Sequence, residues 1–419
     1  MFAQYKNCLC FIFLAFAAHV AADETNNVTG NEQLQFSAFA TLGAVYADSD
    51  HHGYRKSVGS NDAVYSGDID FKQHSLLGLQ IDWSISANFD AVFQGVLRDL
   101  PELSLDKLTT LAFLRYDVNS NWSLRLGRTA PDIFLLTEYR DVDFSYIWAT
   151  APNEIYGIVP YRSIDGFDVT YSRRALGGIF KTKLFIGESD ADIAANTTVV
   201  DIKIEDILGI ALSFDHFNWI VHAKYSQVTI ASEPGTNASL AANINETPDF
   251  LWPNSQDFSL SLLMKGQKVD YSSLSGQYQW GNWLASAEMS QIKSASTVIP
   301  KITSGYAALS YQFNNAHQFY GIYAVTDSDN YIFDEPGVNQ QALEEVIHAT
   351  DDLLNFYVTN QETISLGWRW DITSYMASSL QWNYTSLKEG GSTLWLNKPD
   401  QHDVAESVNT FLLTLSMVY

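Results

Sequence analysis

Long charged side chains recur at alternate positions of short segments in which the other positions are apolar. Arg115 and Arg125 lie in two segments of this kind, residues 109–117 and 122–128. A period of two is typical of a β-strand, which sends successive side chains to opposite faces of a sheet. The polar positions therefore share one face of a predicted sheet. The charged residues assigned to this face are Arg98, Arg115, Arg125, Lys181, Lys183, Lys224, Glu288 and Arg369.

Basic residues outnumber acidic ones on this polar face, although the formal net charge of the chain is -24. The acidic residues gather instead in the predicted loops and turns. A packed interior has little use for so many long polar groups, whereas a water-filled lumen accommodates them. Such a lumen is expected to favour anions. The alternative is that Arg115, Asp117, Arg369 and Asp371 form ion pairs across the wall.

Residues 129–163 form a long connection that is too apolar and aromatic to stand free in water. We expect this connection to fold into the lumen as a constriction, because irregular backbone at membrane depth is tolerated where it lines a cavity. Glu138, Arg140, Asp141 and Asp143 would then face the passage. The alternative is that the connection packs on a neighbouring subunit.

Other candidate sites carry weaker signals. Asp48, Asp50, His51 and His52 offer ligands for a divalent cation, but a hydrated loop is the favoured explanation of the cluster. No nucleophile elbow, phosphate loop or His-Glu-x-x-His pattern occurs. His74 and Ser75 are adjacent and would point to opposite faces of a strand. The sequence therefore predicts no enzyme, no cofactor and no metal.

The elements that position these residues are strands, the last of which spans residues 407–419. Phe411, Leu413, Leu415, Met417 and Tyr419 alternate along it. About ten tilted residues suffice to cross a bilayer as a strand. A barrel suits such an apolar ending, since lipid covers one face and closure pairs the free edge. The full set of predicted strands is 33–47, 74–85, 89–98, 109–117, 122–128, 164–172, 179–187, 202–214, 219–229, 269–280, 283–292, 304–313, 318–326, 362–372, 376–387 and 407–419.

Short and long breaks alternate between these strands, as in outer-membrane barrels. The predicted fold is all-β: a 16-stranded antiparallel transmembrane β-barrel with an inward-folded constriction loop. A helical spacing of apolar residues also predicts a short helix at 339–356, within a late external loop. Aromatic residues make up 14% of the chain and sit at strand ends, where membrane interfaces place them. The alternative is a secreted soluble β-protein that buries them.

Residues 1–22 resemble a secretory signal, with Lys6 before a short apolar core and a small-residue cleavage site at Ala21 and Ala22. Residues 23–419 would then form the barrel domain. Cys8 and Cys10, the two cysteines of the chain, lie within the predicted signal. The mature chain is therefore expected to have no disulfide. Its strongly acidic charge argues against nucleic acid as a partner.

Residues 121–136, NWSLRLGRTAPDIFLL, resemble the strand-and-loop segment of phosphate-selective-type Gram-negative porins, around the triplet Leu126-Gly127-Arg128. The resemblance implies a homotrimer in the outer membrane, in contact with the lipid bilayer and lipopolysaccharide. The terminal Tyr419 departs from the usual Phe, and no ladder of arginines is legible. Together, pattern and resemblance predict a passive diffusion channel for small hydrophilic solutes or ions. The alternatives are a non-conducting structural or adhesion barrel and a barrel-wall hydrolase.

Overall fold

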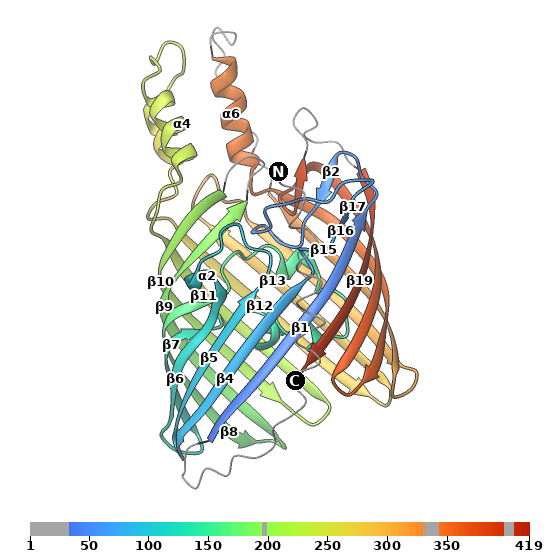
Figure 1. Ribbon diagram of the computed structural model, residues 1–419. Coiled ribbons are helices and arrows are strands. Elements are labelled where there is room, and N and C mark those ends of the chain that lie inside the picture. The colour runs from blue at the N-terminus through green and yellow to red at the C-terminus, as the bar shows by residue number, and fades with distance from the viewer. Residues whose placement is uncertain (1–32, 195–198, 330, 332–342, 398–405) are drawn as a thin grey trace, which may run out of the picture.

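Sixteen strands form one closed antiparallel barrel in the computed structural model, which describes residues 33–194, 199–329, 331, 343–397 and 406–419 (Figure 1). The sixteen predicted strands are confirmed. Their bounds are β1 Gln33–Ala47, β4 Leu76–Ser86, β5 Phe89–Leu97, β6 Thr109–Asp117, β7 Trp122–Thr129, β8 Ile164–Ala175, β9 Gly178–Ala194, β10 Val199–Asp215, β11 Trp219–Ile230, β12 Lys268–Trp280, β13 Trp283–Ser294, β14 Ile302–Gln312, β15 His317–Ser328, β16 Thr359–Thr373, β17 Met376–Ser392 and β19 Glu406–Val418.

The last strand closes the barrel against the first. β19 pairs with β1 from Phe39↔Val418 to Ala47↔Thr410, and the Tyr419 amide donates to the Ala38 carbonyl at 2.7 Å. Closure leaves no unpaired edge at this seam, where an open sheet would expose backbone groups that lipid cannot satisfy.

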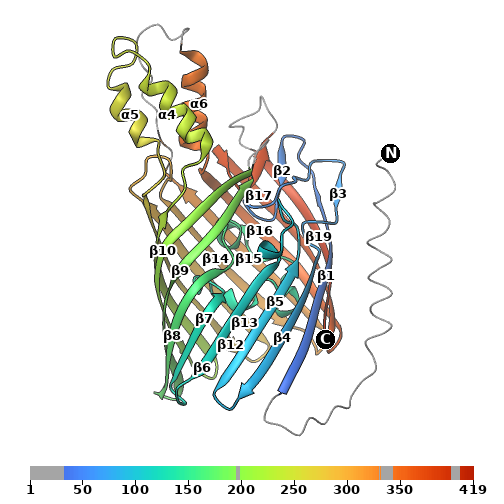
Figure 2. The same ribbon diagram turned by 60° about the vertical axis from the view of Figure 1, so that its left-hand side comes forward.

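The two ends of the barrel differ in their connections (Figures 1 and 2). Tight turns join strands at one end, for example Gly281 and Asn282 between β12 and β13. The other end carries the long connections, including residues 48–75, 130–163 and 231–267. Three short strands lie in this long-loop end: β2 His52–Tyr54 pairs with β18 Trp395–Asn397, and β3 Ile69–Asp70 adds to β1.

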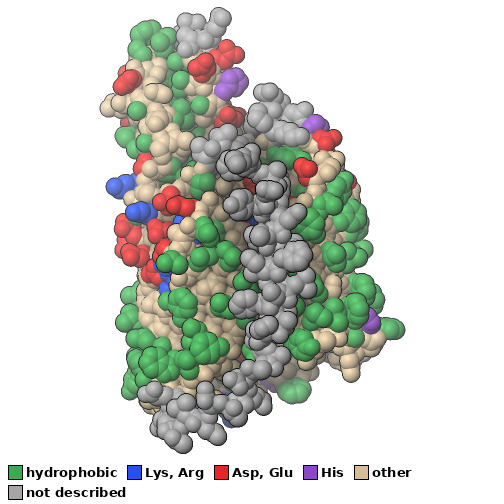
Figure 3. Space-filling model, viewed as in Figure 1, with side chains coloured by type: hydrophobic (Ala, Val, Ile, Leu, Met, Phe, Trp, Pro, Cys, Tyr) green, Lys and Arg blue, Asp and Glu red, His purple; other side chains and the backbone are tan. Residues whose placement is uncertain are grey.

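Alternation along each strand separates an apolar outer face from a polar inner face. On β19, Phe411 and Leu413 point outward and are about half exposed, whereas Thr410 and Thr414 point inward and are buried. Apolar side chains cover much of the outer wall (Figure 3). A wall of this kind requires an apolar surrounding, because so large an apolar surface is unfavourable in water.

Helices are few, and the three longest lie at the long-loop end. α4 Gly235–Asn245 and α5 Ser255–Ser261 pack together, and α6 Glu344–Asn355 packs beside α4 above the barrel rim (Figures 1 and 2). The predicted late helix is therefore present, and its first predicted residues lie outside the described part. α2 Leu105–Leu108 sits between β5 and β6. Among the described residues, no helix has the length and apolarity needed to cross a membrane. The predicted signal, with both cysteines, lies outside the described residues.

The triplet Leu126-Gly127-Arg128 has a local structural reason. Gly127 adopts a φ of 123°, and a Cβ at this position would lie 2.3 Å from the Ala112 carbonyl oxygen. Only glycine fits there without displacing the neighbouring strand. The next residue, Arg128, pairs with Asp165 of β8 at 2.5 Å and with Asp106 of α2 at 2.8 Å.

Candidate functional site

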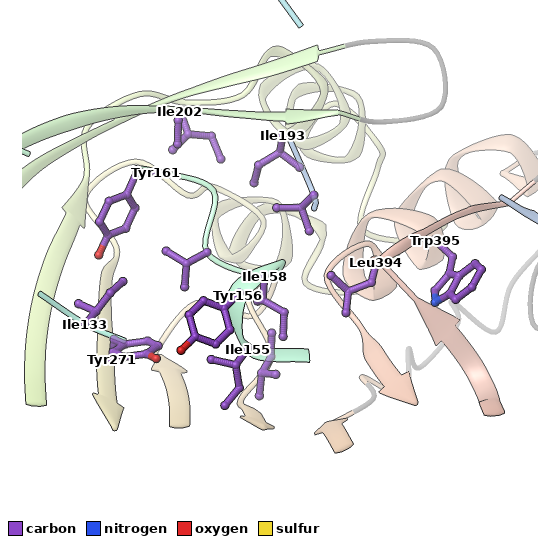
Figure 4. Close-up of a cluster of buried hydrophobic side chains, with 14 of the residues drawn as sticks. Ile133, Ile155, Tyr156, Ile158, Tyr161, Ile193, Ile202, Tyr271, Leu394 and Trp395 are labelled. Atoms are coloured by element: carbon purple, nitrogen blue, oxygen red, sulfur yellow. The ribbon is translucent and has the colours of Figure 1, made fainter. Parts of the chain in front are cut away.

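Residues 130–163, called the inserted loop below, lie inside the barrel. The loop contains two 3₁₀ turns, η1 Thr137–Tyr139 and η2 Asp143–Ser145, and the short helix α3 Asn153–Tyr156. Its side chains pack against inward-facing residues of the long-loop half of the wall, such as Ile193 and Ile202 (Figure 4). The loop is thus the predicted inward-folded constriction, because its aromatic and aliphatic residues are buried within the barrel. The alternative, packing on a neighbouring subunit, is not needed to bury these residues.

The beginning of the inserted loop is held by two lysines. Asp132 accepts from Lys183 of β9 at 2.8 Å and from Lys224 of β11 at 2.7 Å. Lys224 also donates to the Phe134 carbonyl and is almost fully buried. Burial by itself raises the pKa of the Asp132 carboxyl, but the two ammonium groups outweigh it and hold that pKa well below its usual value.

Glu288 of β13 joins both limbs of the inserted loop to the wall. Its carboxylate accepts from the Leu135 amide, in the first part of the inserted loop, at 3.0 Å. It also accepts from the Tyr156 hydroxyl, in the last part of the inserted loop, at 3.1 Å. Because one buried carboxylate satisfies both donors, its removal would leave two polar groups without partners.

The middle of the inserted loop is held from the opposite strands. Arg369 of β16 donates to the carbonyls of Phe144, at 2.8 Å, and Tyr146. Its Nε contacts Asp371 on the same strand at 2.8 Å. Gln381 of β17 accepts from the Ala149 amide at 3.2 Å. This side of the loop is therefore anchored by a guanidinium and an amide.

Helix α3 carries a buried carboxylate, Glu154, that also bonds to the wall. Glu154 accepts from Gln361 at 2.7 Å and from Thr363, both on β16. Gln361 in turn accepts from Ser392 at 2.8 Å and Trp395 at 2.9 Å. These hydrogen bonds link the inserted loop to the segment between β17 and β19.

The predicted passage residues of the inserted loop have specific partners. Arg140 donates to the carbonyls of Tyr156, Val159 and Tyr161 at 2.8–3.0 Å, which joins the two limbs. Asp141 pairs with Arg162 at 2.7 Å and approaches Arg98, at the end of β5, to 3.9 Å. Asp143 belongs to η2, which contacts β1 and β19. The Glu138 side chain lies outside the described residues.

Three further predicted cations lie on the inner wall and pair sideways with acids on neighbouring strands. Arg115 contacts Asp90 at 2.8 Å, Arg125 contacts Asp168 at 2.8 Å and Lys181 contacts Asp215 at 3.1 Å. The Arg115 and Lys181 side chains remain 43% and 47% exposed although they point inward. This accessibility indicates that the lumen near the short-turn end contains water.

Sequence reasoning missed the acidic partners and thus overestimated the excess of positive charge. Asp90, Asp168 and Asp215 occupy inward positions of their own strands, so alternation could have assigned them to the lumen. Asp132 and Asp141 belong to the inserted loop and not to a strand. The alternation of strand faces therefore cannot predict where their side chains lie. Of the four residues expected to form ion pairs, Arg369 pairs with Asp371, and Arg115 pairs with Asp90 of β5.

Replacing Arg125 with Met should destabilise the barrel by about 3–5 kcal/mol, because Asp168 would remain as a buried charge without its partner. The Asp168 side chain is 2% exposed, and Arg125 contacts both of its oxygens. Reversible urea unfolding in detergent micelles measures the change. Lys181→Met is the matched control, since that lysine is half exposed and should matter little. Equal effects for the two variants would contradict the prediction.

Hydrogen bonds hold the segment that contains Asp48, Asp50, His51 and His52. Asp48 accepts from the Asn409 side chain at 2.7 Å, and the Ser49 hydroxyl accepts from the amides of His51 and His52 at 3.1 and 3.0 Å. In the described part of the chain, no group of three His, Cys, Asp or Glu side chains is arranged to hold a metal ion.

Solved structures with a similar fold include outer-membrane channels. The outer membrane channel DcaP of Acinetobacter baumannii matches with a TM-score of 0.57 at 10% identity, over 95% of this chain and all of that one. An anion-selective porin from Comamonas acidovorans matches with a TM-score of 0.53 at 12% identity, over 93% of this chain and all of that one. OmpF of Salmonella typhi matches with a TM-score of 0.54 at 12% identity, over 93% of this chain and 98% of that one. No protein-family model and no curated protein sequence match the chain. At these identities the likeness describes the fold: the chain has the barrel architecture of outer-membrane porins.

Proposed function

We propose that this protein is a porin of the Gram-negative outer membrane, a passive diffusion channel for small hydrophilic solutes or ions. The observation that carries the proposal is the water-accessible charge inside a barrel whose outer wall is apolar. Arg115 and Lys181 point into the lumen yet remain 43% and 47% exposed. A barrel that served only as an anchor would need no such hydrated interior. Transport would need no covalent chemistry, no cofactor and no metal.

A modest preference for anions is part of the proposal. Most cations on the inner wall contact an acid on a neighbouring strand, and in two clusters at the inserted loop two cations contact the same acid. Lys183 and Lys224 share Asp132, and Arg98 and Arg162 share Asp141. These cations lie beside the constriction, where charge acts most strongly on passing ions. The contributions of Arg115, Arg125, Arg140 and Arg369 to ion preference stay predictions.

The surroundings of the channel follow from the same proposal. The long-loop end would face the cell exterior and the short turns the periplasm, as in other barrels of this membrane. The apolar wall would contact the lipid bilayer, and its upper rim lipopolysaccharide. A homotrimer is proposed by resemblance to porins, and residues 1–22 as a cleaved export signal.

A non-conducting barrel is the second candidate, since the inserted loop reaches opposite sides of the wall. Val142 packs beside Phe39, Leu76 and Val96 of β1, β4 and β5, whereas Leu135 bonds to Glu288 of β13. A loop with contacts on both sides could fill the lumen. A structural barrel would give no channel steps in a bilayer.

Planar-bilayer recording distinguishes these candidates. We expect stepwise conductance for the purified protein and a reversal potential in a KCl gradient that favours chloride. The double variant Lys183→Gln/Arg162→Gln should move the reversal potential toward zero, because it removes two cations beside the constriction. Lys388→Gln is the control, since that lysine pairs with Glu362 at 2.8 Å on the outer face. An unchanged reversal potential would overturn the anion preference, and an absence of steps would overturn the channel.

A further inference from the structure

The barrel wall has a notch at its long-loop end. β5 and β6 contain 9 residues each and β7 contains 8, whereas β9 and β10 contain 17 each. β8 pairs with β9 only as far as Asp165↔Glu188, so residues 189–194 of β9 extend beyond it. At the ends of β9 and β10 the alternation is inverted, with Ala191, Ile193 and Ile202 buried inside and charged residues outside, and the predicted strand 179–187 stops short of this extension. At the long-loop end, the barrel wall is therefore shorter from β5 to the unpaired edge of β9 than it is at β9 and β10.

Helix α2 and one ion pair span this notch. Lys107 of α2 contacts Asp192 of β9. Arg128 at the end of β7 holds Asp106 of the same helix at 2.8 Å. On the inner side, the Val58 carbonyl accepts from the Ala194 amide at 2.8 Å and so covers part of the β9 edge. The notch is bridged by side chains and is not closed by strand pairing.

A cavity of about 350 Å³ occupies the notch and touches both faces of the wall. Its inner lining includes Arg98 and Arg162, which contact Asp141 of the inserted loop. Its outer lining includes Asp201 and Lys203 of β10, whose neighbour Ile202 is buried inside the barrel. Since successive strand residues point to opposite faces, the two charged side chains lie outside. The cavity thus runs from the inserted loop to the outer surface.

The cavity is too polar to face lipid tails. Five cations and seven acids line it, and many of them form ion pairs. Asp190, Asp201 and Lys203 are exposed on the outer wall and form no salt bridge within the described part of the chain. On the inner side, one terminal nitrogen of Arg98 is buried without a hydrogen bond to the described residues. Buried polar atoms of this kind normally bond to water or a ligand.

We propose that this cavity is a side portal, through which ions and small zwitterionic solutes pass between the outer surface and the lumen beside the inserted loop. The inference rests on the proposed channel function and adds a second route to it. The described loops over the barrel mouth pack on one another: the Val58 amide donates to the Gly157 carbonyl at 3.0 Å, and Tyr54 and Leu394 are buried there. A polar opening through the wall avoids that packed layer.

The chemistry of the two ends defines the solute class. Arg98 and Arg162 at the inner end fit a carboxylate or another small anion. Asp190 and Asp201 at the outer end fit an ammonium group. A volume near 350 Å³ is at the lower end of small-molecule pockets, which suits a solute of amino-acid size.

Cysteine labelling tests the portal. Cys8 and Cys10 are the only cysteines of the 419-residue sequence and lie in the predicted signal, so one introduced cysteine can be modified selectively. Glu102→Cys and Asp201→Cys each place a thiol on the cavity lining. Attachment of a bulky neutral methanethiosulfonate reagent should lower single-channel conductance by about half if two parallel routes carry similar current. Reduction of the mixed disulfide should restore it.

Asp327→Cys provides the matched control, because Asp327 is exposed on β15, far around the barrel from the cavity. Each variant is compared before and after labelling, so the lost carboxylate does not affect the comparison. A decrease at residues 102 and 201 but not at 327 supports the portal. Channel steps that are unchanged by full labelling at 102 and 201 would overturn the portal and leave the channel intact. No steps from any sample, the wild type included, would overturn both.

Discussion

A variant in which a short glycine-serine turn joins Thr129 directly to Ile164 should conduct at least about twofold more current per channel, because conductance follows the open cross-section. The deleted residues pack on both sides of the lumen, from Val142 near β1 to Leu135 at β13. Their removal opens the interior along its whole width. The joining turn is geometrically suitable, since Thr129 and Ile164 lie opposite each other in the β7–β8 register. Single-channel recording in a planar bilayer measures the change.

Two checks accompany the loop deletion. The loop covers inward apolar residues such as Ile202 and Ile204, so the variant should be less stable, and resistance to protease must establish that the barrel still forms. Deletion of residues 235–262, which form the α4–α5 hairpin above the rim, is the control and should leave the conductance unchanged. A folded loop-deletion variant with wild-type conductance would show that the inserted loop does not limit the passage.

The strands could be predicted because each carries its own signal. Lipid on one side and water on the other impose alternation within every strand, so no contact with a distant segment is needed to recognise it. β19 is a clear case, with Phe411 and Leu413 outside and Thr410 and Thr414 inside. The ends of β9 and β10 differ, since residues 189–194 and 199–203 place Asp and Lys on the outer face above the apolar wall and apolar side chains inside. The alternation is inverted there relative to the lipid-facing wall, so the pattern expected of a lipid-facing strand ends before the notch.

The inserted loop could be predicted from its composition, but its anchors could not. Apolar residues in a long connection indicate burial, which is a local property. The bond from Glu288 to Leu135 joins positions 153 residues apart, and the bond from Arg369 to Phe144 joins positions 225 apart. Only the closed barrel brings such groups together. Several charged residues that sequence analysis assigned to the passage thus also hold the loop in place, a role that a single sequence does not reveal.

Replacing Asp132 with Asn should release the beginning of the inserted loop and destabilise the barrel by about 3–5 kcal/mol, because two lysines would lose their shared partner. Lys224 is 3% exposed and Lys183 is 12% exposed, so neither ammonium group would be well hydrated. A loosened loop should also increase current noise in the open channel. Urea unfolding in micelles measures the first effect and single-channel recording the second. The double variant Asp132→Asn/Lys224→Met should recover part of the lost stability, since it removes the most deeply buried unpaired charge.

The dependence of this anchor on pH has a definite sign. The folded-state pKa of Asp132 lies well below its ordinary value, so the anchor contributes its stability above the ordinary pKa of an aspartate. That contribution is lost only as the pH falls toward the lower folded-state pKa. The difference in stability between wild type and Asp132→Asn should therefore stay constant from about pH 8 to pH 5 and shrink in stronger acid. Asp270→Asn is the matched control, because Asp270 is on the outer wall and bonds there to Tyr225 and Gln227. A difference that disappears between pH 8 and pH 5, or an equal loss in the Asp270 variant, would show that the two lysines do not hold the loop through Asp132.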